Sequence, residues 1–146
     1  MSGALRVGIA GAGWMGHVHA AAWAAEPRAR VVAVADVSPD RAHALATSVR
    51  GHVSTHPSLA AMLSAGDTDV LDVCLPPAEH AEAVVDGLRS GVHVLCEKPL
   101  CLTLAEARDI ARAVDAAAGR LVCAHVMLFT PSFVAARALV RDGAVG

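Results

Sequence analysis

Short apolar runs alternate along the chain with longer stretches in which apolar residues recur at helical spacing. The apolar runs predict six strands, at about residues 5–10, 30–36, 51–54, 72–75, 92–98 and 121–125. The stretches between them predict helices at about residues 14–26, 38–49, 59–66, 78–90, 103–119 and 131–142. Strands that alternate with helices favour right-handed parallel crossovers. The sequence therefore predicts an α/β fold with a doubly wound, six-stranded and mainly parallel sheet, the Rossmann fold.

A glycine-rich turn follows the first predicted strand directly. Gly11, Gly13 and Gly16 form the pattern GxGxxG, with Trp14 and Met15 inside it. In this context Gly11 permits a tight turn, Gly13 permits close approach of a pyrophosphate, and Gly16 permits close packing of helix on strand. Such turns are common, so the pattern alone is a weak signal. Its place between a strand and a helix predicts a dinucleotide site formed by these five residues.

Asp36 ends the second predicted strand, 20 positions after Gly16. A carboxylate at this place accepts hydrogen bonds from an adenosine ribose 2′-OH and repels a 2′-phosphate, which favours NAD over NADP as the cofactor. Arg41, five residues further on, weakens that preference. The alternative interpretation is that Asp36 is a turn residue before Ser38 and Pro39.

Lys98 follows an apolar run that begins at Val92 and reads as a buried strand. Pro99 cannot donate to a ladder, so the strand ends there and Lys98 lies at its carboxyl end. In open parallel sheets ligands bind at that edge. Lys98 is therefore either a solvated loop lysine or a cation placed over a cofactor or substrate.

Composition narrows the class of protein. The chain has 146 residues, 55% of them hydrophobic, which is enough for one domain with a buried core. The net charge is −2 and no basic run is present, which argues against nucleic acid as a partner. No apolar run approaches the ~20 residues of a membrane span. The start of the chain has no signal-peptide pattern, so we expect a cytoplasmic protein.

The cysteines and histidines do not predict a metal site. Four cysteines, none in a CxxC pair, read as small apolar residues in a reducing compartment: Cys74, Cys96, Cys101 and Cys123. His17 and His19 lie two apart in a predicted helix, on different faces, and no HxxxH pair is present. We expect solvated or capping histidines and no metal ligands. Only His80 and His125 fall at predicted carboxyl edges of the sheet.

These motifs, in this order, resemble the nucleotide-binding domain of the Gfo/Idh/MocA family. The resemblance rests on residues 11–16, Asp36, residues 72–77 with His80, and residues 97–99, and it covers about residues 5–131. The triplet Glu97-Lys98-Pro99 is its most specific part. Family members are NAD(P)-dependent oxidoreductases that act mostly on sugars, sugar nucleotides and polyols such as inositol.

The resemblance implies roles for residues beyond the glycine turn. Lys98 would be the catalytic residue, which orients a substrate hydroxyl and the nicotinamide ribose, and the peptide bond to Pro99 would be cis. The cofactor, NAD rather than NADP, would also contact residues after the fourth, fifth and sixth strands: Leu75, Pro76, Pro77, His80, Glu97, Lys98 and His125.

The chain departs from the family pattern at two places. Val126 and Leu128 stand where the family often has an asparagine and an arginine. The family also continues for ~150–250 residues, an ordinary domain size, into a second domain that supplies the proton-transferring Asp and His. Residues 143–146 resemble the entry to that domain. We therefore expect a Rossmann domain over residues 1–124, a connecting segment over residues 125–146, and no catalytic base in this chain.

Two functions from different classes follow. The first is the NAD-binding domain of an oxidoreductase that transfers a hydride to or from a sugar or polyol. The second is a non-catalytic dinucleotide-binding module, in which Phe133 and Val140 of the last helix form a surface covered by a partner or a second copy. A domain for S-adenosylmethionine or coenzyme A is disfavoured by Asp36 and by residues 97–99 together.

Overall fold

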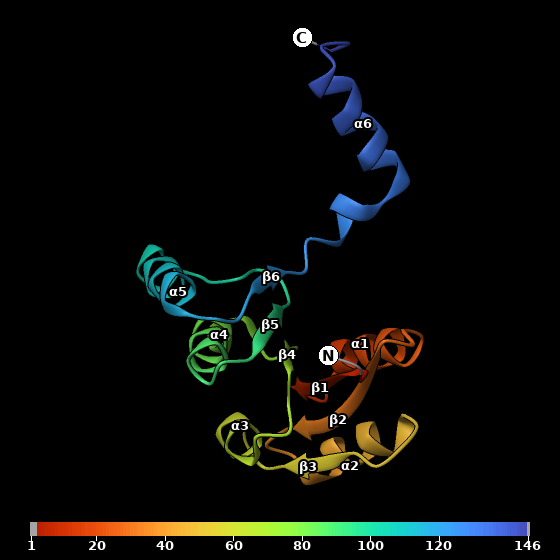
Figure 1. Ribbon diagram of the computed structural model, residues 1–146, viewed down its shortest axis with the longest axis vertical. Helices are drawn as coiled ribbons and strands as arrows, with labels where there is room; N and C mark the ends of the chain where they lie inside the picture. The colour runs from red at the N-terminus through yellow and green to blue at the C-terminus, as the bar shows by residue number, and fades with distance from the viewer. Residues whose placement is uncertain (1–2, 146) are drawn as a thin grey trace.

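Six parallel strands form one twisted sheet in the order β3-β2-β1-β4-β5-β6 (Figure 1). The computed structural model describes residues 3–145. Met1 and Ser2, at the start of the chain where no signal peptide is predicted, and Gly146, the last residue of the predicted entry to a second domain, lie outside the described residues. The strands are β1 (Leu5–Ala10), β2 (Ala29–Ala35), β3 (Ser54–His56), β4 (Val70–Val73), β5 (His93–Cys96) and β6 (Leu121–Cys123).

Helices cover both faces of this sheet (Figure 1). They are α1 (Trp14–Ala24), α2 (Pro39–Ser48), α3 (Leu59–Ala65), α4 (His80–Arg89), α5 (Leu104–Ala116) and α6 (Pro131–Arg141), with the 3-10 turns η1 (Pro77–Glu79) and η2 (Val126–Phe129). The strand order and the crossovers confirm the predicted Rossmann fold.

Two apolar cores hold the layers together. Leu45 and Ala20 pack from α2 and α1 on one face of the sheet. Leu88 and Ile110 pack from α4 and α5 on the other face. Burying a side chain such as Leu45 or Leu88 stabilises the fold by about 1.5–3 kcal/mol. The sheet is thus buried on both sides, and its carboxyl edge is left to form the site.

The ends of several elements differ from the prediction. The third strand was predicted over residues 51–54, but it forms at Ser54–His56 because Gly51 has a φ of +99° and makes a turn. The fourth was predicted over residues 72–75, but it ends at Val73, and the chain then leaves the sheet toward Pro76. Strand β5 likewise ends at Cys96, so that Lys98 lies in the loop that follows.

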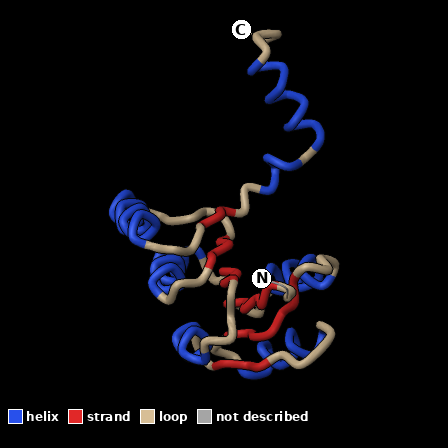
Figure 2. Tube along the Cα trace, viewed as in Figure 1, coloured by secondary structure: helices blue, strands red, loops and turns tan. Residues whose placement is uncertain are grey.

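Helix α6 stands away from the sheet (Figures 1 and 2). Phe133 is 40% exposed and Val140 is 62% exposed, which confirms the predicted apolar surface on this helix. No helix in residues 3–145 combines the length and the apolar character needed to cross a bilayer.

Candidate functional site

A groove of about 450 Å³ opens where β1, β2 and β4 end. Its walls come from the glycine turn, the end of β2 and the loop after β4. The predicted site residues that line it are Gly11, Gly13, Trp14, Met15, Asp36, Leu75 and Pro76; Val37, Arg41, Cys74 and Glu79 complete the lining. The groove therefore brings together residues that are 65 positions apart in the chain, counted from Gly11 to Pro76.

The three glycines of the turn are required for different reasons. Gly11 has a φ of +98°, and a Cβ there would overlap the carbonyl group of Cys74. A Cβ on Gly16, which is buried under the groove and does not line it, would overlap the carbonyl oxygen of Gly11. Gly13 is different, because its φ is −80° and a Cβ would meet no described heavy atom within 4 Å. Protein packing explains Gly11 and Gly16, and it does not explain Gly13.

Helix α1 begins at the floor of this groove with its amide groups uncapped by side chains. Gly13 is the N-cap residue and makes no side-chain cap, and the first turn carries no acidic residue. The N-terminal end of a helix is partly positive, because its first N–H groups have no partner within the helix. The groove therefore offers an anion a site made of backbone amides.

Asp36 is buried at the other side of the groove and holds the local backbone in place. Its carboxylate accepts hydrogen bonds from the N–H groups of Ala12 and Ser38, both at 2.8 Å. Arg41 donates to the same carboxylate, with its Nη2 at 2.8 Å. Burial by itself raises the pKa of Asp36, but the hydrogen bonds from Arg41, Ser38 and Ala12 together lower it. Asp36 is therefore an anion whose charge is balanced by Arg41.

The Glu97-Lys98-Pro99 segment makes a tight corner after β5. The Lys98–Pro99 peptide bond is cis, as the resemblance implied. Lys98 is exposed, and its backbone N–H donates to Oε2 of Glu97 at 2.9 Å. Glu97 is itself buried. Its carboxylate therefore braces the corner, and neither residue lines the groove.

His80 is fully buried and connects the two loops that flank this corner. Its Nδ1 lies 2.7 Å from the carbonyl oxygen of Pro99, and its Nε2 lies 2.8 Å from that of Leu75. Both ring nitrogens are therefore engaged within the protein. His80 holds the loops and does not line the groove, and its predicted contact with a cofactor stays a prediction.

Two predicted residues lie at the exposed rim of the sheet edge. Pro77 begins η1 and His125 precedes η2, and neither is part of the groove lining. His125 Nε2 lies 3.6 Å from Sγ of Cys123. Their contact with a cofactor stays a prediction.

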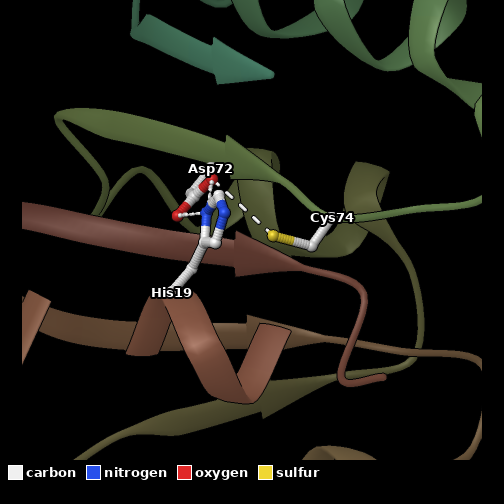
Figure 3. Close-up of side chains that lie close together, drawn as sticks. All are labelled: His19, Asp72 and Cys74. Atoms are coloured by element: carbon white, nitrogen blue, oxygen red, sulfur yellow. Dashed lines mark hydrogen bonds and ion pairs between the residues drawn. The ribbon is translucent and has the colours of Figure 1, made fainter. Parts of the chain in front are cut away.

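Sequence reasoning missed a buried polar cluster beneath this edge (Figure 3). His19 was expected to be solvated or to cap a helix, which is wrong: its side chain is only 11% exposed. Its Nδ1 lies 2.9 Å from Asp72 Oδ2, and its Nε2 lies 3.2 Å from Glu97 Oε1. Ligand-type atoms of His19, Asp72 and Cys74 lie within 4.8 Å of one another, although no metal-type spacing was seen in the sequence. The sequence holds one indication of this cluster: α1 follows β1 directly, and Asp72 and Glu97 lie in two other predicted strands, so all three residues belong near the same edge of the sheet.

A second and larger hollow, of about 920 Å³, lies between α4 and α5. Charged side chains of both signs line it, among them Asp86, Arg89, Glu106 and Arg112. Its lining includes no residue of the glycine turn and none from the end of β2. The smaller groove is the functional candidate because the glycine turn, Asp36 and the start of α1 meet there.

The fold and the groove together define a dinucleotide-binding domain of the Rossmann type. Comparison with protein families agrees. Residues 5–125 match the family model for Gfo/Idh/MocA oxidoreductases, described as an oxidoreductase family with an NAD-binding Rossmann fold. The chain belongs to this family, and it forms the family's NAD-binding domain.

Individual relatives show how much of a family member the chain represents. It is 34% identical over 142 residues to inositol 2-dehydrogenase of Rhizobium meliloti (strain 1021), which covers 97% of the chain and 42% of that enzyme. It is 32% identical to D-apiose dehydrogenase of Paraburkholderia graminis, over 94% of the chain and 36% of that enzyme. Among solved structures, GenD2 from gentamicin A biosynthesis, in complex with NAD, has a TM-score of 0.86 and 30% identity, over 97% of the chain and 40% of GenD2. The chain thus spans less than half the length of these relatives.

Proposed function

We propose that the groove binds NAD and that the chain is the cofactor-binding part of a dehydrogenase that acts on a hydroxyl group of a sugar or polyol. The observation that carries the proposal is the open space at Gly13. A side chain there would fill space that the protein itself leaves empty. A ligand that needs close approach to the backbone explains the glycine.

The residues of the groove fit the parts of NAD. The first amides of α1 and the Gly11–Gly13 turn would hold the diphosphate. Asp36 would accept hydrogen bonds from the adenosine ribose, with Arg41 beside it. Leu75 and Pro76 would contact the nicotinamide half, with Pro77 and His125 at the rim. When bound, NAD supplies the hydride-transfer chemistry.

Lys98 would serve the substrate side of the reaction. It is an exposed cation at the carboxyl edge of the sheet, held at the cis corner described above. An ammonium group at this place stabilises negative charge that develops on a substrate hydroxyl oxygen. The proton acceptor that such a reaction needs would come from outside residues 1–146, as the resemblance implies.

The substrate class and the surroundings of the domain rest on the relatives and on α6. The names of the relatives specify inositol and apiose, which supports a small polyol or sugar as substrate. The apolar face of α6 supports contact with further polypeptide, either a second copy or a partner, and a division near residue 124 between the Rossmann domain and the connecting segment. Four free thiols support a reducing compartment such as the cytoplasm.

Calorimetric titration of the 146-residue chain with NAD, NADH, NADP and NADPH tests the proposal. We expect saturable binding of NAD(H), tighter than that of NADP(H). A folded sample that binds none of the four would reject it. The alternative is a non-catalytic dinucleotide-binding module, which the exposed apolar face of α6 favours. Turnover of any polyol in a panel by the 146-residue chain would reject this alternative.

A further inference from the structure

A buried cluster of His19, Asp72 and Glu97 lies beneath the Lys98 corner, and its hydrogen bonds determine how many protons the His19 ring carries. His19 lies between two carboxylates, with Nδ1 at 3.0 and 2.9 Å from the two oxygens of Asp72 and Nε2 at 3.2 Å from Glu97. Ionised carboxylates only accept hydrogen bonds. Both ring nitrogens must therefore carry a proton for both contacts to be hydrogen bonds, so the ring is an imidazolium.

Other donors complete the cluster around Asp72. The indole N–H of Trp23 donates to Asp72 Oδ2 at 2.6 Å, and the thiol of Cys74 donates to Asp72 Oδ1 at 3.7 Å. Asp72 has no exposed surface, so its charge is offset by these donors and by His19. Three hydrogen-bond donors on the Asp72 carboxylate favour a hydrogen-bonded network over a metal site, because a metal ion would need the same oxygens as ligands.

The network ends at the backbone of Lys98. One oxygen of Glu97 faces His19, and the other accepts the N–H of Lys98 at 2.9 Å. The hydrogen bond from His19 to one oxygen of Glu97 restricts rotation of the carboxylate and so fixes the position of the oxygen that accepts from Lys98. The chain of contacts therefore runs from Asp72 through His19 and Glu97 to the peptide that carries the Lys98 side chain.

We propose that His19 is a positioning residue for Lys98: its charged ring, anchored on Asp72, fixes the Glu97 carboxylate that holds the Lys98 corner. The proposed role of Lys98 toward substrate rests on the proposed function, whereas the positioning itself does not. His19 does not line the groove and is only 11% exposed, so it acts through Glu97 and is not a catalytic residue.

The surroundings of His19 support the charged ring. The titratable groups that face the cluster are Asp72 and Cys74 from β4 and the loop after it, and Glu97 and Cys96 from β5 and its end. The hydrogen bond to Asp72, opposed by burial and assisted by Glu97, raises the pKa of His19. The two cysteines stay as thiols, because burial raises the pKa of Cys74 and raises that of Cys96 to about 12. The nearby charged groups are therefore the two carboxylates.

The sequence offers a single reporter for this proposal, because Lys98 is its only lysine. A chain grown with ¹⁵N-lysine gives one backbone amide signal in a ¹H–¹⁵N spectrum, without any assignment. The carboxylate partner should move this signal downfield and slow its exchange with solvent. These two quantities report directly on the contact between Lys98 and Glu97.

The test compares His19→Gln with His17→Gln, which removes an exposed histidine two residues earlier on the same helix. In His19→Gln, we expect the Lys98 amide to move upfield and to exchange at least about tenfold faster, the factor that one hydrogen bond corresponds to. In His17→Gln the rate should stay within about twofold, as for a surface substitution. Equal spectra for the two variants would overturn the proposal.

Glu97→Gln shows whether His19 acts through Glu97. The amide oxygen of the new side chain still accepts from Lys98, but it no longer attracts an imidazolium. Adding His19→Gln to this variant should then change the Lys98 exchange rate by much less than it does in the native chain. Full additivity of the two changes would show that His19 acts by another route.

Measurements on the unsubstituted chain apply even where a variant fails to fold. With ¹⁵N-histidine label, the ring of His19 should carry protons on both nitrogens above pH 6.5, and the Lys98 amide should shift as this ring titrates. A Lys98 signal that is constant through this titration would overturn the proposal. So would a shift caused by micromolar Zn²⁺ after EDTA treatment, which would make the cluster a metal site. None of these readouts needs NAD, so absence of NAD binding would reject the proposed function alone.

Discussion

The imidazole of His80 lies 2.7 Å from the carbonyl oxygen of Pro99, and this contact ties helix α4 to the residue after Lys98. The same ring lies 2.8 Å from the carbonyl oxygen of Leu75, a residue that lines the groove. One buried side chain thus joins the loop after β4 to the loop after β5. It links the groove to the lysine corner.

Replacing His80 by alanine should lower the free energy of unfolding by about 2–4 kcal/mol. The change removes a fully buried ring from beside the carbonyl oxygens of Pro99 and Leu75, and each hydrogen bond lost there costs about 1–3 kcal/mol, part of which water entry recovers. Urea unfolding measures it. His52→Ala, in an exposed loop, is the control and should change stability by less than about 0.5 kcal/mol. Equal stabilities would mean that the ring does not hold the loops.

Replacing Gly13 by valine should abolish NAD binding without unfolding the chain. The valine Cβ meets no described heavy atom, so stability should change by no more than about 1 kcal/mol, the cost of an altered N-cap. The side chain would occupy the groove, and we expect the Kd for NAD to rise at least about 100-fold, or 2.7 kcal/mol. Calorimetry measures the binding and urea unfolding measures the stability.

Two other glycines serve as controls for this prediction. Gly3→Val, also in open space, should leave both binding and stability unchanged. Gly16→Ala should lower stability by about 1–3 kcal/mol, because the new Cβ overlaps the carbonyl oxygen of Gly11 and backbone must move. A Gly13→Val chain that binds NAD normally would remove the main support for the groove as the cofactor site.

Replacing Arg41 by alanine should sharpen the preference for NAD over NADP. Arg41 neutralises Asp36, to which its Nη2 donates at 2.8 Å, and it offers a cation to a 2′-phosphate. Without it, Asp36 repels the phosphate unopposed. We expect the Kd for NADP(H) to rise about tenfold, or 1.4 kcal/mol, and that for NAD(H) to rise less than about threefold. Arg50→Ala, an exposed arginine just past the end of α2, is the control. An equal rise in Kd for NAD(H) and NADP(H) would mean that Arg41 does not contact the 2′-phosphate of the adenosine ribose.

The contribution of His19 to stability should fall as the pH rises. The pKa of His19 is raised in the folded chain, by its hydrogen bond to Asp72 against the effect of burial. Its contribution is therefore fully present below the unfolded pKa, near 6.5, and is lost as the pH rises through the folded pKa. The difference in unfolding free energy between the native chain and His19→Gln should thus be larger at pH 6 than at pH 9. A difference that grows with pH would contradict a charged ring.

The order of elements, the glycine turn and the places of Asp36 and Lys98 could all be predicted from the sequence. Each depends on local rules: apolar period for strands and helices, backbone freedom for Gly11, and the ladder that Pro99 cannot join. Because crossovers between parallel strands have one hand, this order of elements also predicts a doubly wound parallel sheet with the motifs at its carboxyl edge. The order of the strands within the sheet comes from the tertiary structure. The family resemblance depends on the same local motifs.

The positions of His19 and His80 were decided by tertiary structure alone. His19 meets carboxylates that lie 53 and 78 residues away, and His80 meets a carbonyl 19 residues away. No period or spacing in the sequence marks such partners, because they come from separate strands whose carboxyl ends converge only when the sheet forms. Burial then turns each histidine from a solvated side chain into a hydrogen-bonded tie, since a buried polar group must find a partner.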